Sequence, residues 1–295
     1  VPATRYVGYF DPDKCYRYNY AATEPDRHFA PVGARTSAGC PGKAWDGRFL
    51  NWAATQTIDP FRKALTGGYR VRDTDTETWL EKADFSVAAR SANFPTRRFP
   101  AAGSIASQVH AATPATWGYV HARVHGLGAR MFFTGSGPID SAVTATAYNP
   151  DDLRHPLSEG PGGDMGQVYE VSVRVKVCDA SVGLEDNCQS YARAAKPEGL
   201  LQAYSDRLRF SIFGYINNGG PTPQDQGGYE VAPDGGVLRA RQKFIGPIRH
   251  DPFKPTANPN VEWDTVTGVQ KRNPDPADAA ATGGGIVDSG VINYL

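Results

Sequence analysis

The segment from residue 168 to residue 216 constrains the fold of this chain most, because its hydrophobic pattern is the most regular. Apolar residues occupy every second position from Tyr169 to Val177 and alternate with polar residues. This period of two predicts a strand with one face in a core and the other in water. Val173 is therefore expected to be buried, and Arg174 is expected to face solvent.

Helical spacing follows this strand. Pro197 precedes an apolar stripe made of Leu200, Leu201, Tyr204 and Leu208, and proline is favoured in the first turn of a helix. Residues 210–216 then predict a second strand. A strand, a helix and a strand in succession favour a βαβ unit with a right-handed crossover, so we expect an α/β protein with a layered sheet covered by helices.

Composition and charge exclude two classes of partner. The 295 residues include 31 Lys plus Arg and 31 Asp plus Glu, and no basic run forms a local patch, so nucleic acid is not an expected partner. No stretch is long and apolar enough for membrane insertion. We interpret the chain as a single domain over residues 1–295, with an elaboration at residues 94–166, where the periodicity weakens.

The four cysteines form two local pairs, Cys15 with Cys40 and Cys178 with Cys188. Three pairings are possible, and the local one is favoured because each pair closes a short polar loop. Four free thiols and a zinc site are the alternatives, although no CxxC motif is present. Disulfides indicate the periplasm or the cell surface. The start at Val1, without an initiator methionine or an apolar signal segment, fits a mature secreted protein or an excised fragment.

A row of tyrosines near the N-terminus is the candidate binding surface. Residues 5–10 predict a short strand that ends in a turn. Tyr16, Tyr18 and Tyr20 then alternate with polar residues, which would place three rings on one side of an extended segment. Such a row could bind a sugar or a partner chain, or it could cover the first disulfide loop.

A helix is predicted to begin near residue 59. Asp59 precedes Pro60 as an N-cap residue precedes the first helical position. Phe61 and Ala64 would lie on the buried face, and Gly67 would end the helix.

The acidic run at residues 73–77 invites two interpretations. Carboxylates at alternate positions suit a calcium ion, but Thr78 stands where the turn of an EF-hand loop needs glycine. A capped helix start is favoured instead, with Trp79 and Leu80 packing inward.

Two histidines alternate with apolar residues in a predicted strand at residues 119–125. His121 and His125 would lie about 13 Å apart on one face of such a strand, too far apart to share a metal ion. We therefore interpret both as surface residues.

Seven blocks of the sequence resemble the N-terminal region of PilY/PilC proteins, which are tip-associated adhesins and biogenesis factors of bacterial type IV pili. The blocks are YVGYFDPDKCY at 6–16, RFLNWA at 48–53, ALTGG at 64–68, VRVKVC at 173–178, KPEGLLQ at 196–202, GGVLRA at 235–240 and SGVINYL at 289–295.

The resemblance implies a fold and a function. In this family the N-terminal region is related to the von Willebrand factor A fold, and a C-terminal propeller binds calcium. We therefore expect a von Willebrand A-like sheet, heavily elaborated by loops and extra strands, in an exported protein of the periplasm and then the pilus tip at the cell surface. Its expected partners are the minor pilins and a host or abiotic surface. No propeller repeat occurs in this chain, so calcium is expected only in that C-terminal module.

No motif in the sequence indicates catalysis. GxSxG, HExxH and a Walker loop are absent. The DxSxS metal loop of von Willebrand A domains is absent too, and the nearest match, at residues 179–183, lies inside the second disulfide loop. We therefore expect a non-catalytic protein without cofactor or metal that supports pilus extension and adhesion. A carbohydrate- or surface-binding module unrelated to pili is the alternative, followed by a secreted hydrolase.

Overall fold

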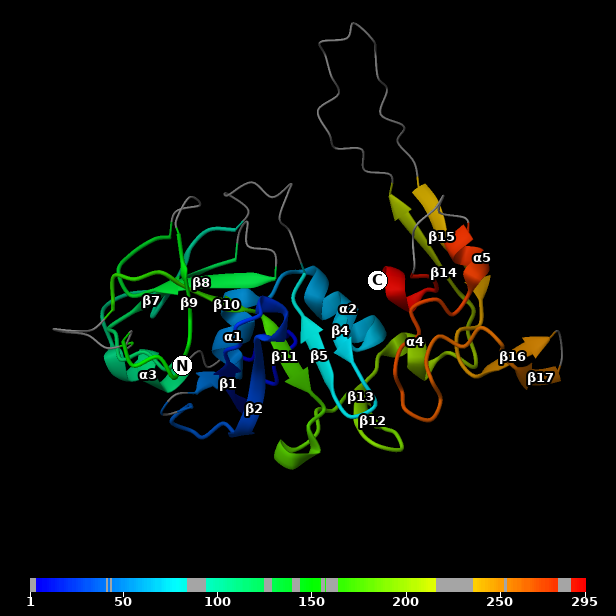
Figure 1. Ribbon diagram of the computed structural model, residues 1–295, viewed down its shortest axis with the longest axis horizontal. Coiled ribbons are helices and arrows are strands. Elements are labelled where there is room, and N and C mark those ends of the chain that lie inside the picture. Colours follow the sequence, from blue (N-terminus) through cyan, green and yellow to red (C-terminus); the bar gives the residue numbers. More distant parts are fainter. Residues whose placement is uncertain are drawn as a thin grey trace, which may run out of the picture. The chain divides into compact units, whose positions relative to one another are not determined.

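The computed structural model describes residues 4–40, 42, 44–83, 94–124, 129–139, 144–154, 157, 164–215, 236–251, 254–280 and 288–295. The chain divides into two compact units, Val1–Gly199 and Leu200–Leu295 (Figure 1). The interpretation of residues 1–295 as a single domain stays a prediction. The secondary structure is a mixed α/β arrangement with several sheets and few, short helices.

The first unit contains a six-stranded sheet. Its strands, in spatial order, are β3 (Trp45–Asp46), β1 (Lys14–Asn19), β2 (His28–Ala34), β11 (Arg174–Val177), β5 (Thr78–Glu81) and β4 (Arg70–Asp73). Neighbouring strands are antiparallel except for the parallel pair β2 and β11. A mainly parallel sheet covered by helices, as expected for a von Willebrand A-like fold, is not found among the described residues.

A five-stranded sheet completes the first unit. Its strands, in spatial order, are β6 (Arg97–Phe99), β7 (Val120–Arg123), β8 (Arg130–Thr134), β10 (Tyr169–Ser172) and β9 (Thr146–Ala147). All of them except β10 come from residues 94–166. The segment expected as an elaboration therefore supplies most of a second sheet.

Short elements fill the rest of the first unit. They are the helices α1 (Gly47–Ala54), α2 (Ile58–Thr66) and α3 (Ala106–Ala112), the 3-10 turns η1 (Glu24–Asp26) and η3 (Ala180–Val182), and the hairpin of β12 (Cys188–Ser190) and β13 (Ala195–Pro197).

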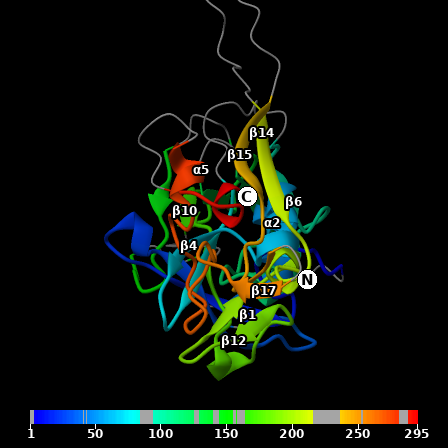
Figure 2. The ribbon, with the colours of Figure 1, turned by 90° about the vertical axis from the view of Figure 1, so that its right-hand side faces the viewer.

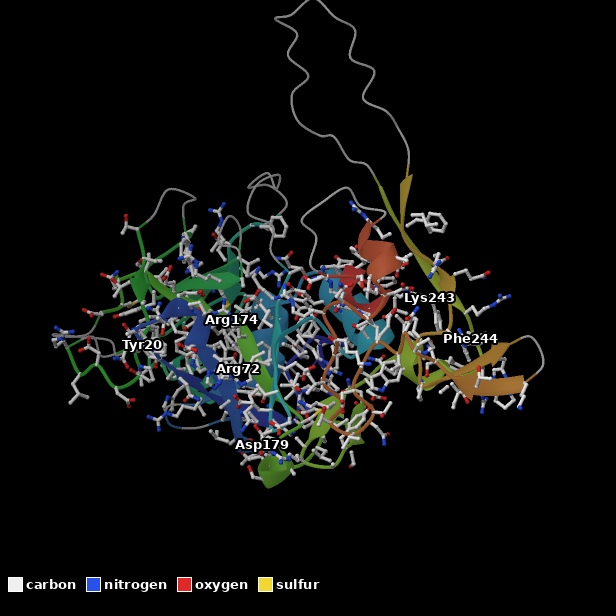
Figure 3. All side chains as sticks on the ribbon, turned by 45° about the vertical axis from the view of Figure 1, so that its right-hand side comes forward. Tyr20, Arg72, Arg174, Asp179, Lys243 and Phe244 are labelled. Carbon is white, nitrogen blue, oxygen red and sulfur yellow. A yellow bond between two sulfur atoms is a disulfide. The ribbon has the colours of Figure 1, made fainter. Side chains whose placement is uncertain are left out.

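The regular segment at residues 169–177 passes from one sheet to the other. It breaks at Val173, so that β10 belongs to the five-stranded sheet and β11 to the six-stranded sheet. Val173 is buried, as expected, but Arg174 is only 9% exposed, so the prediction that it faces water is wrong. Arg174 pairs with Glu81 and, at 3.1 Å, with Glu24 (Figure 3). The two acidic partners make burial of the guanidinium possible.

The helices of the first unit differ from those predicted. α1 was not predicted, although Asp46 caps it by accepting the N–H groups of Arg48 and Phe49. α2 begins at Ile58, before Asp59, and its Phe61 is 52% exposed, so the predicted buried face is wrong; Ala64 is also exposed. The predicted end at Gly67 is confirmed, because this glycine adopts the left-handed conformation (φ 86°).

Two other segments are not what the pattern predicts. Residues 5–10 form no strand, and the first strand starts at Lys14, after a turn. Residues 73–77 form the turn between β4 and β5, not a helix start, although Trp79 and Leu80 are buried as expected. Thr74 Oγ1 accepts the N–H groups of Thr76 and Glu77 and so stabilises this turn.

The second unit is built from hairpins and short turns. Its elements are α4 (Leu200–Ala203), β14 (Phe210–Tyr215), β15 (Gly236–Lys243), β16 (Ile248–Asp251), β17 (Lys254–Ala257), α5 (Pro276–Ala280) and η5 (Ile292–Tyr294). β14 and β15 pair along their length as an antiparallel ribbon (Figure 2), and β16 pairs with β17.

The predicted βαβ unit is therefore wrong. β14 confirms the second strand of the pattern up to residue 215, and Ile216 lies outside the described residues, but β14 pairs antiparallel with β15 and not with β11. The predicted helix is limited to the four residues of α4. Pro197, expected in its first turn, is the last residue of β13. Of the apolar stripe, Leu201 is buried (6% exposed), whereas Leu200, Tyr204 and Leu208 are exposed.

An aromatic cluster joins the two sheets of the first unit. Trp45 is fully buried, and its ring contacts four others, from Phe29, Phe49, Phe133 and Tyr148, at centroid distances of 5.1 to 6.2 Å. Phe29 belongs to the six-stranded sheet, and Phe133 belongs to the five-stranded sheet. Trp45 therefore connects both sheets with α1, and its burial stabilises the unit as a whole.

None of the helices in the described part of the chain combines the length and the apolar character that crossing a membrane requires.

Candidate functional site

Both predicted disulfides are present. Cys15 on β1 is bonded to Cys40, and Cys178, directly after β11, is bonded to Cys188 on β12. Each bond fastens a loop to a strand of the first unit.

One group of possible metal ligands lies close together in the described part of the chain, and it surrounds the second disulfide. Cys178, Glu185 and Cys188 bring their ligand atoms within 4.8 Å of one another. The two sulfurs are bonded to each other and offer no thiolate. Glu185 pairs with Lys14 (2.8 Å) and accepts the Cys178 N–H (2.7 Å). The carboxylate therefore organises the disulfide loop.

The nearest match to a DxSxS loop is also satisfied internally. Asp179 accepts a hydrogen bond from Lys176 Nζ (2.8 Å), which is the main reason that the pKa of this carboxyl is lowered to about 2. Ser181 donates two further hydrogen bonds to the same carboxylate, one from its N–H and one from its hydroxyl. Figure 3 shows the position of Asp179.

The oxygens of the turn at residues 73–77 surround an ammonium group. Lys196 Nζ is fully buried and donates to Asp73 Oδ1 (3.0 Å), Thr78 Oγ1 (3.0 Å), the Glu77 carbonyl (3.2 Å) and the Thr74 carbonyl. Of the three alternating carboxylates that suggested a calcium loop, Asp73 contacts Lys196, Asp75 pairs with Arg193 and Glu77 pairs with Arg72. Each of them therefore has a cationic partner from the same chain.

The tyrosine row is mostly part of the core. Tyr16 and Tyr18 are 0% and 1% exposed, and their hydroxyls accept the N–H groups of Asp11 and Ser172. The expectation that these two rings form an exposed surface is wrong, because they alternate toward the aromatic cluster. Tyr20, at 41% exposed, is the one member of the row that a partner could contact; Arg27 stacks on its ring at 4.8 Å (Figure 3).

The predicted surface histidine of β7 is buried. His121 is 7% exposed, and burial, together with the charge of Arg98, lowers the pKa of its imidazole. His125 lies outside the described residues.

A cavity of about 620 Å³ opens beside the loop that joins α1 to α2. Three parts of the first unit meet there: the loop itself with the start of α2, the segment leading into β6, and the end of β7. The lining residues are Thr55, Gln56, Thr57, Ile58, Phe61, Phe94, Arg97 and Val124. Most of this lining is apolar, which is typical of ligand sites that add a few polar groups for orientation.

The loop of the cavity is held by a buried carboxylate. Asp59 is 1% exposed, and its two oxygens accept the N–H groups of Gln56 (2.9 Å) and Ala83 (2.8 Å). Burial raises the pKa of this carboxyl, against the lowering effect of these two bonds. The backbone of Gln56 is therefore fixed.

The side-chain amide of Gln56 has no hydrogen-bond partner among the described residues. The residue is 7% exposed, and neither Oε1 nor Nε2 bonds to any group of that part of the chain. A buried polar group without a partner costs about 1–3 kcal/mol, so such an amide in the wall of a cavity is expected to pair with whatever fills the cavity.

Arg97 is the charged group of the cavity. It donates to the Trp52 carbonyl, and no carboxylate of the described residues lies within ion-pair distance of it. Burial lowers the pKa of this guanidinium. Sequence reasoning missed Gln56 and Arg97, since neither belongs to a motif and only the fold brings them together.

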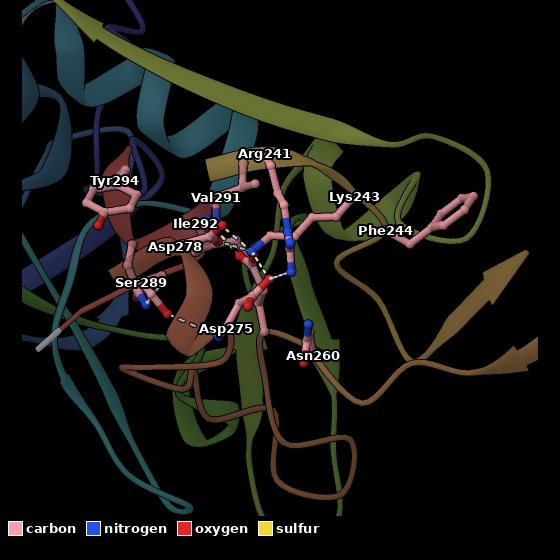
Figure 4. A network of polar contacts seen from close by, with 12 residues as sticks. Arg241, Lys243, Phe244, Asn260, Asp275, Asp278, Ser289, Val291, Ile292 and Tyr294 are labelled. Atoms are coloured by element: carbon pink, nitrogen blue, oxygen red, sulfur yellow. Dashed lines mark hydrogen bonds and ion pairs between the residues drawn. The ribbon is translucent and has the colours of Figure 1, made fainter. Parts of the chain in front are cut away.

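A second polar centre lies in the other unit. Lys243 Nζ on β15 lies 3.0 Å from Asp275 and 3.9 Å from Glu262, and it also contacts Asp278 (Figure 4). Glu262 is 1% exposed.

Glu262 also holds the last turn of the chain. Its two oxygens accept the N–H groups of Val291 (2.7 Å) and Ile292 (2.8 Å). Burial raises the pKa of the Glu262 carboxyl to about 7, although these bonds and Lys243 oppose the shift. These groups satisfy one another, so the network is a structural element of the second unit.

Comparison with known proteins places the chain in a family. A family model described as "PilY1 homolog, small alpha/beta domain" matches residues 1–116. A protein of Xylella fastidiosa named type IV pilus biogenesis factor PilY1 homolog is 50% identical over 307 residues, which cover 100% of this chain and 24% of that protein. A second PilY1 homolog of the same organism is 26% identical over 260 residues, covering 80% of this chain and 16% of the relative.

No solved structure matches the chain. The chain spans about a quarter or less of the length of the curated relatives it matches. Since the family model and the relative that covers the whole chain agree, the chain belongs to the PilY1 homolog family and represents a part of the length of its members.

Proposed function

We propose that this chain is a non-catalytic binding component of type IV pilus assembly, which acts in an exported protein at the pilus tip. The observation that carries the proposal is the 50% identity, over the whole chain, to a protein named a type IV pilus biogenesis factor. The expected partners are minor pilins, and adhesion to a host or abiotic surface is a second role of the same protein. The von Willebrand A relationship of this region rests on the resemblance of its sequence blocks alone.

Two features of the structure support a binding role outside the cytoplasm. The two disulfides suit an oxidising compartment such as the periplasm. The cavity beside α2 combines apolar walls with the Gln56 amide, which has no hydrogen-bond partner in the described part of the chain, as is common in binding sites. The proposed role needs no cofactor in this chain, and calcium would belong to another part of the whole protein.

The proposal is tested by complementation in a bacterium with type IV pili whose own family member is deleted. The gene for the whole protein is returned either intact or without the region equivalent to this chain. We expect the intact protein to restore surface pili and to co-purify with minor pilins, and the shortened protein to do neither.

Immunoblots of exported protein provide the control for stability. Full piliation and pilin co-purification by a well-exported protein that lacks this region would contradict the proposal. Binding of the intact chain to a glycan array, without pilin co-purification, would favour the carbohydrate-binding alternative.

A further inference from the structure

From the cavity beside α2 we infer the chemistry of a partner: it binds an extended peptide segment in which an acidic side chain stands next to an apolar one. This inference rests on the proposed function, since it assigns the partner-binding role to one site of the first unit.

The amide of Gln56 selects a group that both donates and accepts. Neither of its polar atoms has a partner within the described ranges of the chain, and the residue is more than nine-tenths buried. Water can satisfy both atoms in the free protein. A ligand that displaces this water without loss must replace both hydrogen bonds, which a peptide group does with its C=O and its N–H.

Arg97 selects a carboxylate. Its bond to the Trp52 carbonyl uses one of five N–H donors, and among the residues that the structure describes no carboxylate lies within ion-pair distance of it. Guanidinium and carboxylate pair through two parallel hydrogen bonds, and this pairing strengthens when both are shielded from water.

The walls select an apolar side chain. Ile58 and Phe61 from α2 line the cavity together with Phe94 and Val124, and Phe61 is 52% exposed although it is a large aromatic residue. Covering such a ring is favourable by roughly 25 cal/mol per Å² of apolar surface. A fatty acid would satisfy Arg97 and the walls but would leave the Gln56 amide unpaired, and a sugar would leave the walls uncovered.

The test uses the full chain and four probes in titration calorimetry. The reference probe is acetyl-Gly-Phe-Glu-Gly-amide. One variant probe replaces Glu by Gln, another replaces Phe by Ser, and octanoate represents a lipid-like anion. We expect the reference peptide to bind about tenfold or more tightly than either variant peptide, as the loss of a charge-assisted hydrogen bond or of a buried ring predicts.

Variants of the protein locate the binding. Arg97→Met is expected to abolish the preference for Glu over Gln, and Gln56→Leu to weaken all peptides about tenfold. Arg154→Met is the matched control, because Arg154 belongs to the same unit but its side chain is 84% exposed. The side-chain NH₂ resonances of Gln56, assigned with the Gln56→Leu variant, should shift when the reference peptide binds.

Each other outcome overturns the inference. These outcomes are no binding of the reference peptide at millimolar concentration, equal binding of octanoate, and unchanged peptide binding by a folded Gln56→Leu/Arg97→Met variant. Pilin co-purification that survives in this double variant would reject the cavity while leaving the proposed function intact. If the proposed function is wrong and the cavity inference is right, the chain will bind the peptide, but deletion of the equivalent region from the whole protein will not affect piliation.

Discussion

The two units of this chain are stabilised in different ways. The first unit is built around an apolar cluster in which Trp45 contacts rings from both sheets. The described residues of the second unit bury few large apolar side chains and include a largely buried charge network centred on Lys243 and Glu262. Apolar packing tolerates changes of pH, whereas buried charges do not. We therefore expect the first unit to be the permanent scaffold of the binding cavity and the second to respond to conditions.

The largest effect is expected from removing the centre of the aromatic cluster. Trp45→Ala should destabilise the first unit by about 4–5 kcal/mol, since a fully buried ring with four aromatic neighbours leaves a large void. Hydrogen exchange read by mass spectrometry should show lost protection in residues 1–199. Trp263→Ala, at a buried site of the second unit, is the matched variant; similar losses in both units for both variants would remove the distinction between them.

A smaller but still large effect is expected at the ion cluster that Arg174 forms with Glu24 and Glu81 in the first unit. Arg174→Asp should cost about 4 kcal/mol, because it places a third carboxylate beside Glu24 and Glu81 at a site that is 9% exposed. Arg17→Asp serves as control, since Arg17 and its partner Asp151 are both exposed. Urea unfolding of the two variants measures the difference. Equal stability of the two would mean that Arg174 faces water after all.

Arg174 also shows how much of the fold could be predicted from the sequence. The period of two at residues 169–177 correctly predicts β structure, and the local cysteine pairs correctly predict both disulfides. The passage between two sheets at Val173 could not be predicted, because the partners that bury Ser172 and Arg174 lie far away in sequence. Polar residues at alternate positions indicate solvent only when no distant charge is available to pair with them.

The prediction of a buried helix from the apolar stripe after Pro197 was wrong for a related reason. Its spacing is helical, but spacing says which side chains share a face and not whether a core covers that face. The cavity could not be predicted from the sequence, because Gln56, Arg97 and Val124 come from three separate segments. An amide without a partner has no signature in the sequence.

The second unit should depend on pH through Glu262. Its pKa of about 7 in the folded chain lies above the ordinary value of 4.5, so folding favours the protonated form. The stabilisation is complete below about pH 4.5 and decreases as the pH rises through 7, by about 3 kcal/mol in total. Hydrogen exchange in residues 200–295 between pH 5 and pH 8 measures this change.

The control for this prediction is Glu262→Gln, which cannot titrate. Its stability should change less over the same range than that of the unmodified chain. A second unit that becomes more stable, relative to this variant, as the pH rises would contradict the assignment.

The smallest effect is expected at the exposed end of the tyrosine row. Tyr20→Ser should change the free energy of unfolding by less than about 0.5 kcal/mol, because the ring is 41% exposed and contacts Arg27 at the surface. Tyr18→Ser, at 1% exposure, should instead destabilise the first unit by several kcal/mol. Thermal unfolding of both variants distinguishes a surface residue from a core residue within one row.

The most direct test of the central claim, that the first unit binds a pilus partner through its cavity, is the affinity of the full chain for soluble domains of minor pilins. Surface plasmon resonance on the unmodified chain, Arg97→Met and Arg154→Met gives the comparison. We predict that at least one minor pilin binds, that Arg97→Met weakens this binding about tenfold, and that Arg154→Met leaves it unchanged. No binding of any minor pilin, or equal binding by all three chains, would contradict the account.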